Sequence, residues 1–476
     1  MSSKNSDKPN IICILTDDQG AWALGCYGNN ELQTPHIDKL ASEGIRFTNF
    51  FCTSPVCSPA RASLLTGLMP SQHGVHDWIR EGNAGLDGKT YLEGLDAYTE
   101  YLHAHGYNCG LSGKWHLGNS QLRQKGFSHW YAHQKGGGDY YGAPMIRDGV
   151  EVVETEYITD LITDDAMRFI AENAKEDSPF YLSLHYTAPH SPWINQHPKQ
   201  FVSMYDDCPF NSCPREQPHP WNLFVKVPDA IPESIWNNPK EHLQGYYGAI
   251  SAMDWNIGRV VNQIETLGLK ENTLIIFISD NGFNCGHHGI WGKGNGTYPQ
   301  NMYDTSVKVP AIFCHPGSIP AGMVSNSILS GYDFMPTLLG YLNIPYSAKS
   351  KPGKDFSNIL KGNMNQQTHH EAIVVYDEYG PVRMIRTNEW KYVHRYPDGP
   401  NELYHISEDI DERINLVGDD SFVHIAADMK LSMENWFKKY TDPDRDGTKE
   451  LVTGKGQIDL VGARGEGRKA FYDDEE

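Results

Sequence analysis

Long apolar runs are missing from this sequence. The longest, such as Ile11–Leu15 and Leu274–Ile278, contain about five residues, whereas a membrane-spanning helix needs about 20. We therefore expect no membrane span and no membrane partner. A signal peptide also needs an apolar stretch of about 7–15 residues, which the polar N-terminus does not offer. The expected location is cytoplasmic if this N-terminus is native, and periplasmic or secreted if a leader was removed.

Cysteine and positive charge are also scarce in this chain of 476 residues. Its 9 cysteines are odd in number and form no C-x-x-C pair, which excludes a disulfide scaffold. Lys and Arg total 40 against 60 Asp and Glu, so the formal net charge is −20. Because a duplex nucleic-acid binder normally has a basic surface, we expect no nucleic-acid partner. An anionic substrate would need a local basic pocket, since the field of the whole protein repels it.

Alternating strands and helices are predicted over most of the chain. Continuous apolar runs at Ile11–Leu15, Phe180–His185 and Thr273–Ser279 are typical of buried parallel strands. Between them, Ile158–Asn173 and Glu241–Leu267 are predicted to be helices, and in the second the apolar residues recur in steps of three and four. This alternation predicts an α/β fold with a large, mostly parallel sheet flanked by helices.

The pattern changes after about residue 366. Short apolar segments then follow one another closely, separated by turn residues such as Asn388 and Asp398-Gly399-Pro400, which indicates an antiparallel sheet. A helix is predicted at Phe422–Tyr440. We therefore divide the chain into a large N-terminal domain, residues 1–366, and a smaller C-terminal α+β subdomain, residues 367–476, with a short antiparallel sheet and a polar tail.

Acidic and amide side chains follow two of the predicted strands. Asp17 and Asp18 come shortly after the first strand, and Asp280 and Asn281 follow the strand that ends at Ser279. In open parallel sheets, ligands bind beyond the carboxyl ends of the strands. These four oxygen-bearing side chains are therefore candidate ligands for Ca²⁺ or Mg²⁺. Taken alone, each pair is more often simply part of a polar turn.

Cys57 comes immediately before a predicted helix. Pro59 can occupy the first turn of a helix that starts near Ser58, which places Cys57 at a helix N-terminus, where the dipole and the free amides favour anions. Arg61 lies four residues further on, within reach of the same end. A cysteine in this position is otherwise a buried structural residue, as free cysteines usually are.

The segment Cys57-x-Pro59-x-Arg61 with Thr66-Gly67 resembles the signature of type I, formylglycine-dependent sulfatases, in the alkaline-phosphatase superfamily. Further motifs follow in the order of that family: Asn10-Ile11-Ile12 with Asp17-Asp18, Thr34–Ala41, Gly44–Asn49, Gly113–Gly118, Thr187–Pro192, Ser279–Gly282, His288–Gly294 and Glu402-Leu403-Tyr404. The resemblance implies an alkaline-phosphatase-like sheet, with residues 1–366 as the catalytic sulfatase domain.

The resemblance implies a modified nucleophile and a metal ion. In the family, a separate maturation enzyme oxidises the signature cysteine, here Cys57, to formylglycine, and one hydroxyl of the hydrated aldehyde attacks sulfur. Asp17, Asp18, Asp280 and Asn281 would hold Ca²⁺, in preference to Mg²⁺, together with an oxygen of the modified Cys57. The family sometimes has His at the position of Asn281, and the amide oxygen present here is an acceptable ligand.

The resemblance also assigns roles to five basic residues. Arg61 would hold the diol of the modified cysteine. Lys114 and Lys293 would neutralise the sulfate oxygens as charge moves in the transition state. His116 would be the base that triggers sulfate release, and His190 would protonate the leaving alcohol or hydrogen-bond to the ester oxygen. A single histidine outside such a setting is more often a satisfied core or surface residue.

Four more residues are candidate contacts to the organic part of the substrate: His76, Trp78, Arg80 and His288. The first three lie just past the signature helix, and an aromatic ring with charged neighbours can pack on a sugar and bind its polar groups. A packed surface loop is the equally weighted alternative for that segment. His288 matches a family position, but its context gives it no unique charge to carry.

The expected function is therefore that of a sulfuric ester hydrolase. Its substrate would be a small sulfated carbohydrate of the glycosaminoglycan type, and aryl sulfates would serve as artificial substrates, as for an arylsulfatase. One alternative is a phosphonate or phosphate ester hydrolase of the same superfamily, against which the set of Lys114, His116, His190 and Lys293 argues. Another is a carbohydrate-binding pseudoenzyme with an unconverted Cys57. The oligomeric state is not predicted.

Overall fold

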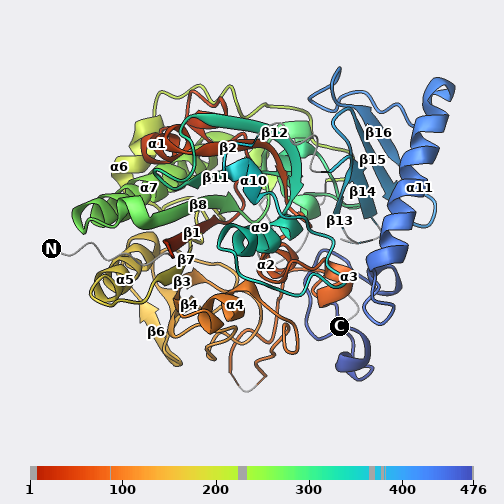
Figure 1. The fold of residues 1–476 in the computed structure, drawn as a ribbon. Coiled ribbons are helices and arrows are strands. Elements are labelled where there is room, and N and C mark those ends of the chain that lie inside the picture. The colour runs from red at the N-terminus through yellow and green to blue at the C-terminus, as the bar shows by residue number, and fades with distance from the viewer. Residues whose placement is uncertain are drawn as a thin grey trace.

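The structure is a computed structural model that describes residues 8–85, 87–222, 233–363, 370–376, 380 and 382–473. A large sheet forms its centre (Figure 1), and its strands are β1 (Asn10–Thr16), β2 (Ile45–Phe51), β3 (Asn108–Lys114), β4 (His129–His133), β5 (Ala143–Arg147), β6 (Val150–Glu154), β7 (Phe180–His185), β8 (Thr273–Ser279), β11 (Lys308–Cys314) and β12 (Met323–Ser330). They lie in the order β12-β2-β11-β8-β1-β7-β3-β4-β5-β6. A separate two-stranded sheet contains β9 (Asn284–Cys285) and β10 (Trp291–Gly292).

The centre of the large sheet is parallel, as predicted. Strands β8, β1, β7, β3 and β4 run in one direction. Every residue of β1 and β8 is buried, because helices cover both faces of the sheet and neither face needs polar side chains. Antiparallel strands flank this centre: β11 runs against β8 and β2, and β4, β5 and β6 form antiparallel pairs. The complete sheet is therefore mixed.

Two local features account for the antiparallel strands. Asp148 and Gly149 join β5 to β6, with φ values of 50° and 86°, as in the tight hairpin turns that Asp-Gly favours. The loops that follow β8 lead to α8 (Asp304–Val307), which lies near the carboxyl end of β8. Because β11 starts from that same end of the sheet, it must run back against β8.

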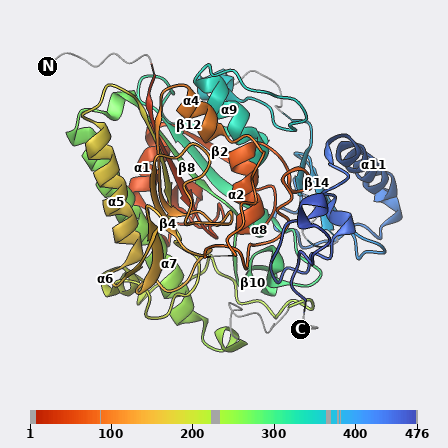
Figure 2. The ribbon, with the colours of Figure 1, turned by 90° about the horizontal axis from the view of Figure 1, so that it is seen from below.

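Helices form one layer on each face of the large sheet. They are α1 (Pro35–Glu43), α2 (Cys57–Thr66), α3 (Pro70–His73), α4 (Tyr98–Ala104), α5 (Ile158–Asn173), α6 (Lys199–Val202), α7 (Pro239–Thr266), α9 (Phe334–Tyr341) and α10 (Ser357–Leu360). Ile12 and Ile14 share a core with α1, α5 and α7, whereas Ile11 and Cys13 share one with α2, α4 and α9. Figure 2 shows these two layers with the sheet between them. In the described part of the chain, no helix has the length and apolar character that a bilayer crossing requires.

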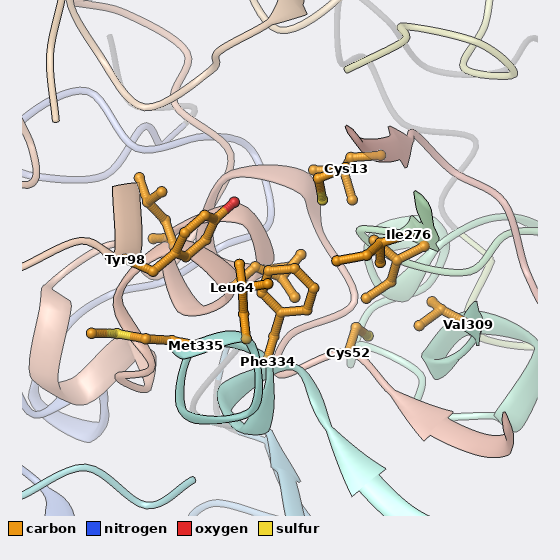
Figure 3. Close-up of a cluster of buried hydrophobic side chains, with 14 of the residues drawn as sticks. Cys13, Cys52, Leu64, Tyr98, Ile276, Val309, Phe334 and Met335 are labelled. Carbon is orange, nitrogen blue, oxygen red and sulfur yellow. The ribbon is translucent and has the colours of Figure 1, made fainter. Parts of the chain in front are cut away.

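A dense apolar core fixes α2 against the sheet. Figure 3 shows Cys13 and Ile276 of the sheet near Leu64 of α2 and Phe334 of α9. The rings of Phe334 and Tyr98 have centroids 5.5 Å apart at an angle of 65°, an edge-to-face arrangement that aromatic pairs favour. This packing holds the first residue of α2 at a set position relative to β1.

The region after residue 366, for which we keep the name C-terminal subdomain, contains a four-stranded antiparallel sheet and one long helix, to the right in Figure 1. Its elements are β13 (Ile373–Tyr376), β14 (Val382–Arg386), β15 (Trp390–Arg395), β16 (Glu402–His405) and α11 (Val423–Tyr440). The predicted antiparallel sheet and helix are therefore present. Met429, Met433 and Phe437 recur every four residues on α11 and share a core with Tyr392 and Leu403, as expected for a helix with one apolar face.

Residues 441–473 return to the large domain, where we expected a polar tail. Gln457 is fully buried and forms a backbone bridge with Ile79. Its side chain donates to the carbonyl of Gly74 at 3.0 Å and accepts from the N–H of His76 at 2.9 Å. The C-terminal segment therefore packs against the loop that follows the signature helix.

Candidate active site

The candidate site lies at the carboxyl ends of the central parallel strands. Thr16, the last residue of β1, pairs with Ser279, the last residue of β8, so the residues that follow the two strands leave the sheet side by side. Asp18 has a φ of 62°, which turns the chain sharply after β1. These positions bring the four candidate metal ligands together in the interior, and they are Asp17, Asp18, Asp280 and Asn281.

The four side chains converge on one point, as the sequence predicted. A carboxylate oxygen of each of Asp17, Asp18 and Asp280 lies within 4.8 Å of the other two. Asn281 donates from Nδ2 to Oδ1 of Asp18 at 2.8 Å. The backbone N–H of Asp18 donates to Oδ1 of Asp280 at 3.3 Å. The two turns therefore form one cluster, which isolated polar turns would not do.

Cys57 is the first residue of α2 and faces this cluster. The residue before it, Val56, is extended and caps the helix. Cys57 is 2% exposed, and its Sγ lies 3.1 Å from Oδ1 of Asp17. Burial, together with the charge of Asp17, raises the pKa of the Cys57 thiol. The unmodified side chain is therefore a neutral thiol, which is a poor nucleophile because thiolates are the reactive form.

Two buried cations come from α2 and β3. Arg61, one turn into α2, donates from Nε to Oδ2 of Asp280 at 2.8 Å. Lys114, the last residue of β3, donates from Nζ to Oδ2 of Asp17. Arg61 also donates from Nη1 to the carbonyl of Lys114 at 3.2 Å, so the two cations are fixed relative to each other.

Lys293 supplies the third cation, from the loop after β10. Its Nζ lies 2.6 Å from Oδ1 of Asp18 and 2.8 Å from Sγ of Cys57. Asn301 holds the backbone of this loop, donating from Nδ2 to the carbonyls of Lys293 at 2.9 Å and Gly294 at 3.2 Å. Three cations thus neutralise three carboxylates in the interior, as buried charges require.

The crowding of carboxylates separates their pKa values. Burial and the charge of Asp17 raise the pKa of Asp280 to about 7. Burial would also raise the pKa of Asp17, but Lys114 and His190 hold it well below its usual value. Opposite shifts of this kind arise where negative charges share one low-dielectric site.

His116 lies beside Lys114 with its ring enclosed. Its backbone φ is 53°, and its Nε2 bonds to the carbonyl of Ile79 at 3.0 Å. Gly136 packs so closely that an added Cβ would lie 2.1 Å from the His116 ring. Burial, with the charge of Lys114, lowers the pKa of His116 well below its usual value. Among the described residues, Nδ1 has no hydrogen-bond partner, so a neutral ring presents a free acceptor.

His190 lies on the other side of the cluster, after β7. Its Nε2 is 3.7 Å from Oδ2 of Asp18, and its Nδ1 is 2.6 Å from the carbonyl oxygen of Ser191. The ring is about 20% exposed, more than any of the three cations. His190 is therefore the predicted proton-transfer residue that a substrate from solution meets first.

Two buried histidines near the site were missed in the sequence. His133 ends β4 in register with Lys114, and His185 ends β7 in register with Gly113. Burial, with the charge of Lys114, lowers the pKa of His133 to about 4, so it is neutral at physiological pH. The rule that sites lie beyond strand ends would have found His185, whose strand was predicted, and would have found His133 had β4 been recognised.

Two of the four candidate substrate contacts, His76 and His288, have rings that pack against other parts of the protein. His76 is fully buried, and its Nε2 bonds to the carbonyl of Arg445 at 3.0 Å. The ring of His288 stacks on Tyr303, with ring centroids 3.7 Å apart. The backbone N–H of His288 donates to Oε1 of Glu216 at 3.2 Å. Neither ring contacts the acidic cluster. The burial of His76 keeps it from contacting a substrate, whereas the half-buried His288 stays a prediction.

Trp78 and Arg80 remain half-exposed beside the C-terminal segment. Trp78 donates from Nε1 to the carbonyl of Gly454 at 3.2 Å. The guanidinium of Arg80 lies 3.7 Å from the ring centre of Tyr472, a cation–π contact. The docked C-terminal segment therefore shapes this edge of the site, which the sequence did not indicate.

The donor set of the acidic cluster fits a divalent metal ion. Three carboxylates and an amide offer the oxygen ligands that Ca²⁺ and Mg²⁺ prefer. Oδ1 of Asn281 is buried and lacks a hydrogen-bond partner within the described ranges, although buried polar atoms are almost always paired. Burial and, after it, the charge of Asp17 raise the pKa of Asp280, and a bound cation would favour its charged form. These oxygen ligands suit either ion and do not by themselves select Ca²⁺.

Two family models match the sequence. The model described as Sulfatase matches residues 9–344, and the model described as N-sulphoglucosamine sulphohydrolase, C-terminal, matches residues 286–439. The first match contains the whole acidic cluster, Cys57 and the surrounding cations. The second extends through the small antiparallel sheet.

Known proteins are similar over nearly the whole chain. N-acetylglucosamine-6-O-sulfatase of Bacteroides thetaiotaomicron is 28% identical over 530 residues, covering 96% of this chain and 91% of that protein. An ulvan-active sulfatase of Formosa agariphila is 32% identical over 437 residues, covering 87% and 78%. A solved structure in complex with its substrate D-glucosamine-2-N,6-O-disulfate superimposes with a TM-score of 0.76 at 26% identity, covering 92% of this chain and 99% of that one.

Proposed function

The chain belongs to the sulfatase family and is a sulfuric ester hydrolase, and we propose that it removes sulfate from sulfated saccharides. Two of its relatives carry the names N-acetylglucosamine-6-O-sulfatase and ulvan-active sulfatase, and a structural neighbour binds a disulfated glucosamine. The proposed natural substrate is a small sulfated saccharide of the glycosaminoglycan type. Aryl sulfates would be artificial substrates.

The position of Lys293 carries this proposal. Its ammonium lies 2.8 Å from Sγ of Cys57, where it would meet an anion transferred to residue 57. Lys114 donates to one carboxylate oxygen of Asp17, and the other oxygen of Asp17 contacts the Cys57 sulfur. In a chain of net charge −20, these two ammonium groups, together with a divalent cation on the carboxylates, would supply the local positive charge that an anionic sulfate group needs. The ammonium groups are preorganised for charge that develops on the sulfate oxygens.

Cys57 is the proposed site of formylglycine. When present, the hydrated aldehyde supplies two hydroxyls on one carbon, one to accept sulfate and one to expel it. Nη2 of Arg61 is buried and has no hydrogen-bond partner in the described part of the chain, so it is free to hold an oxygen of the modified side chain. The proposed partner is a maturation enzyme that supplies the oxidant. Because Cys57 is 2% exposed, that enzyme would act before α2 packs.

We assign the metal to Ca²⁺ rather than Mg²⁺. Asp17, Asp18, Asp280 and Asn281 would hold it, and it would supply Lewis acidity toward the sulfate oxygens. Mg²⁺ demands near-ideal octahedral geometry and keeps several waters, whereas Ca²⁺ accepts irregular sets of about 6–8 oxygens. A cluster built from two strand ends, with three lysine and arginine side chains already among the carboxylates, offers irregular geometry and little room for water.

His116 and His190 are the proposed proton-transfer residues. Nε2 of His116 is engaged by the carbonyl of Ile79, which leaves Nδ1 as the nitrogen that can accept a proton from the modified residue 57. Nδ1 of His190 is engaged by the carbonyl of Ser191, so its Nε2 is the nitrogen that can give a proton to the leaving alcohol. Both carbonyl contacts fix the tautomer, as in other general acid–base sites.

Sulfate release tests this function. The protein, co-produced with a maturation enzyme, would be assayed on defined sulfated mono- and disaccharides, on 4-nitrophenyl sulfate and on 4-nitrophenyl phosphate. We expect release from at least one saccharide and a faster reaction with the aryl sulfate than with the phosphate. Cleavage of the aryl sulfate alone would overturn the saccharide assignment, and faster phosphate cleavage would favour the phosphoester alternative.

A further inference from the structure

A polar cleft of about 660 Å³ opens beside the candidate active site. Arg80 and Lys135 both line it. Arg80 follows Ile79, whose carbonyl binds Nε2 of His116, and Lys135 precedes Gly136, which packs against the His116 ring. The cleft therefore begins one residue away from two contacts of a proposed catalytic histidine.

Arg80 and Lys135 carry positive charges without acidic partners. The guanidinium of Arg80 stacks on Tyr472 and donates to the carbonyl of Lys455 at 3.2 Å. Within the described ranges it forms no ion pair, and the exposed ammonium of Lys135 forms neither an ion pair nor a hydrogen bond. Unpaired cations facing one cleft are unexpected in a chain with 60 acidic and 40 basic residues.

The remaining cations of the cleft are already neutralised. Asp459 binds Lys89 at 2.9 Å and Arg468 at 2.8 Å. Glu81 and Glu151 also line the cleft and are exposed; such carboxylates can accept hydrogen bonds from hydroxyl groups. The cleft thus combines Arg80 and Lys135 with carboxylates that can accept hydrogen bonds, among them the exposed Asp87.

We propose that this cleft is a subsite for a neighbouring sugar of the substrate, and that Arg80 and Lys135 bind an anionic group, a carboxylate or a second sulfate, on that sugar. The inference rests on the proposed function, because it presupposes a saccharide whose sulfate reaches Cys57. It adds that the preferred substrate is an oligosaccharide with anionic groups on successive sugars. The planar guanidinium of Arg80, held on the Tyr472 ring, is suited to grip a carboxylate or sulfate with two hydrogen bonds.

A matched pair of substrates tests the subsite. Both disaccharides end in 6-O-sulfated N-acetylglucosamine; in one the neighbouring sugar is glucuronic acid, and in the other it is glucose, which has the same ring configuration and lacks the carboxylate. We expect the converted enzyme to prefer the acidic disaccharide by about tenfold in kcat/KM, mostly through KM, as for loss of one charged hydrogen bond. Lys135→Gln and Arg80→Gln should each remove most of that preference. Lys175→Gln, at an exposed lysine in the turn after α5, should keep it.

The outcomes separate this inference from the proposed function. Equal cleavage of the two disaccharides by the wild-type enzyme, or an unchanged preference in both variants, would overturn the subsite and leave the saccharide sulfatase standing. Cleavage of 4-nitrophenyl sulfate but of neither disaccharide, nor of any other sulfated saccharide in the panel above, would overturn both. A loss that is equal on 4-nitrophenyl sulfate and on the acidic disaccharide would place Lys135 and Arg80 in the sulfate pocket, which also contradicts the inference.

Discussion

Nζ of Lys293 lies 2.8 Å from Sγ of Cys57, although the two residues are 236 positions apart in the chain. The contact joins the first residue of α2 to the loop after β10. Because the same ammonium also binds Asp18 at 2.6 Å, it lies between the proposed metal site and the proposed nucleophile. Lys293 is therefore the cation through which the two halves of the site are linked.

Lys293→Ala should lower kcat by at least about 10²-fold on 4-nitrophenyl sulfate, comparable to the loss of one oxyanion-type donor. The physical reason is that the sulfate oxygens would lose a buried positive charge as they become more negative. Lys293→Arg should recover part of the rate, and Lys175→Ala should leave it unchanged. A loss smaller than tenfold would exclude Lys293 from the sulfate pocket.

Cys57→Ala should abolish turnover while the protein stays folded. Removing one buried sulfur creates only a small cavity, whereas the methyl group of alanine offers no thiol from which the aldehyde can form. Steady-state sulfate release and thermal unfolding would be measured together, with Cys26→Ala as the control because Cys26 lies outside the acidic cluster. Turnover by a folded Cys57→Ala protein would contradict the aldehyde mechanism.

Chelation should inactivate the enzyme, and Ca²⁺ should restore it better than Mg²⁺. Asn281→Ala removes the unpaired Oδ1 from the acidic cluster, so we expect the Ca²⁺ concentration for half-maximal activity to rise at least about tenfold. Asn262→Ala, at an exposed site on α7, is the control. Full activity after complete metal removal, or restoration by Mg²⁺ alone, would contradict the assignment of the ion.

The acidic cluster could be predicted from the sequence because it depends on strand ends. Apolar runs mark β1 and β8, and the residues after them are fixed in space once the strands pair in parallel. The signature around Cys57 added the helix N-terminus. Local sequence was therefore sufficient wherever the site follows directly from a regular element.

Contacts across long sequence separations could not be predicted. Gln457 is buried against Gly74 and His76, which lie more than 380 positions away in the chain, and nothing in the polar C-terminal sequence marks this docking. His76 therefore looked available for substrate and is instead packed. The direction of β11 was also missed, because it depends on where the loops after β8 end rather than on its own apolar pattern.

Buried neutral histidines should make the fold sensitive to acid. Burial lowers the pKa of His133 to about 4 and that of His197 to about 3, while both titrate near 6.5 when unfolded. The unfolded chain therefore binds more protons below pH 6.5, so stability is lost as the pH falls from about 6.5 toward 4. At pH 5 each histidine should cost about 2 kcal/mol.

His133→Gln or His197→Gln should flatten this dependence. The difference in unfolding free energy between pH 7.5 and pH 5 should shrink by about 2 kcal/mol in each variant. His424→Gln, at an exposed site on α11, should leave the difference unchanged. Chemical denaturation at the two pH values measures it, and an unchanged pH dependence in both variants would show that these rings are protonated in the folded state.

Lys391 of the C-terminal sheet anchors the loop that carries Lys293. Its fully buried Nζ binds the carbonyl of Met302 and Oδ1 of Asp304, both at 2.7 Å, and also Glu412. The loop therefore depends on the small subdomain for one end of its support. This contact predicts that a substitution in the C-terminal sheet affects both stability and catalysis in the large domain.

Lys391→Met should destabilise the protein by about 3–5 kcal/mol, because it leaves buried carboxylates without their cation. Glu412 is one of the buried carboxyl groups that Lys391 binds, so adding Glu412→Gln to Lys391→Met removes one group that has lost its cation and should recover part of the stability. The rate on 4-nitrophenyl sulfate should fall in Lys391→Met even at temperatures where the protein is fully folded, because Lys293 loses its fixed position. If the variant is less stable but fully active when folded, Lys391 has only a structural role. That result would contradict the prediction that the small subdomain helps to position the sulfate pocket.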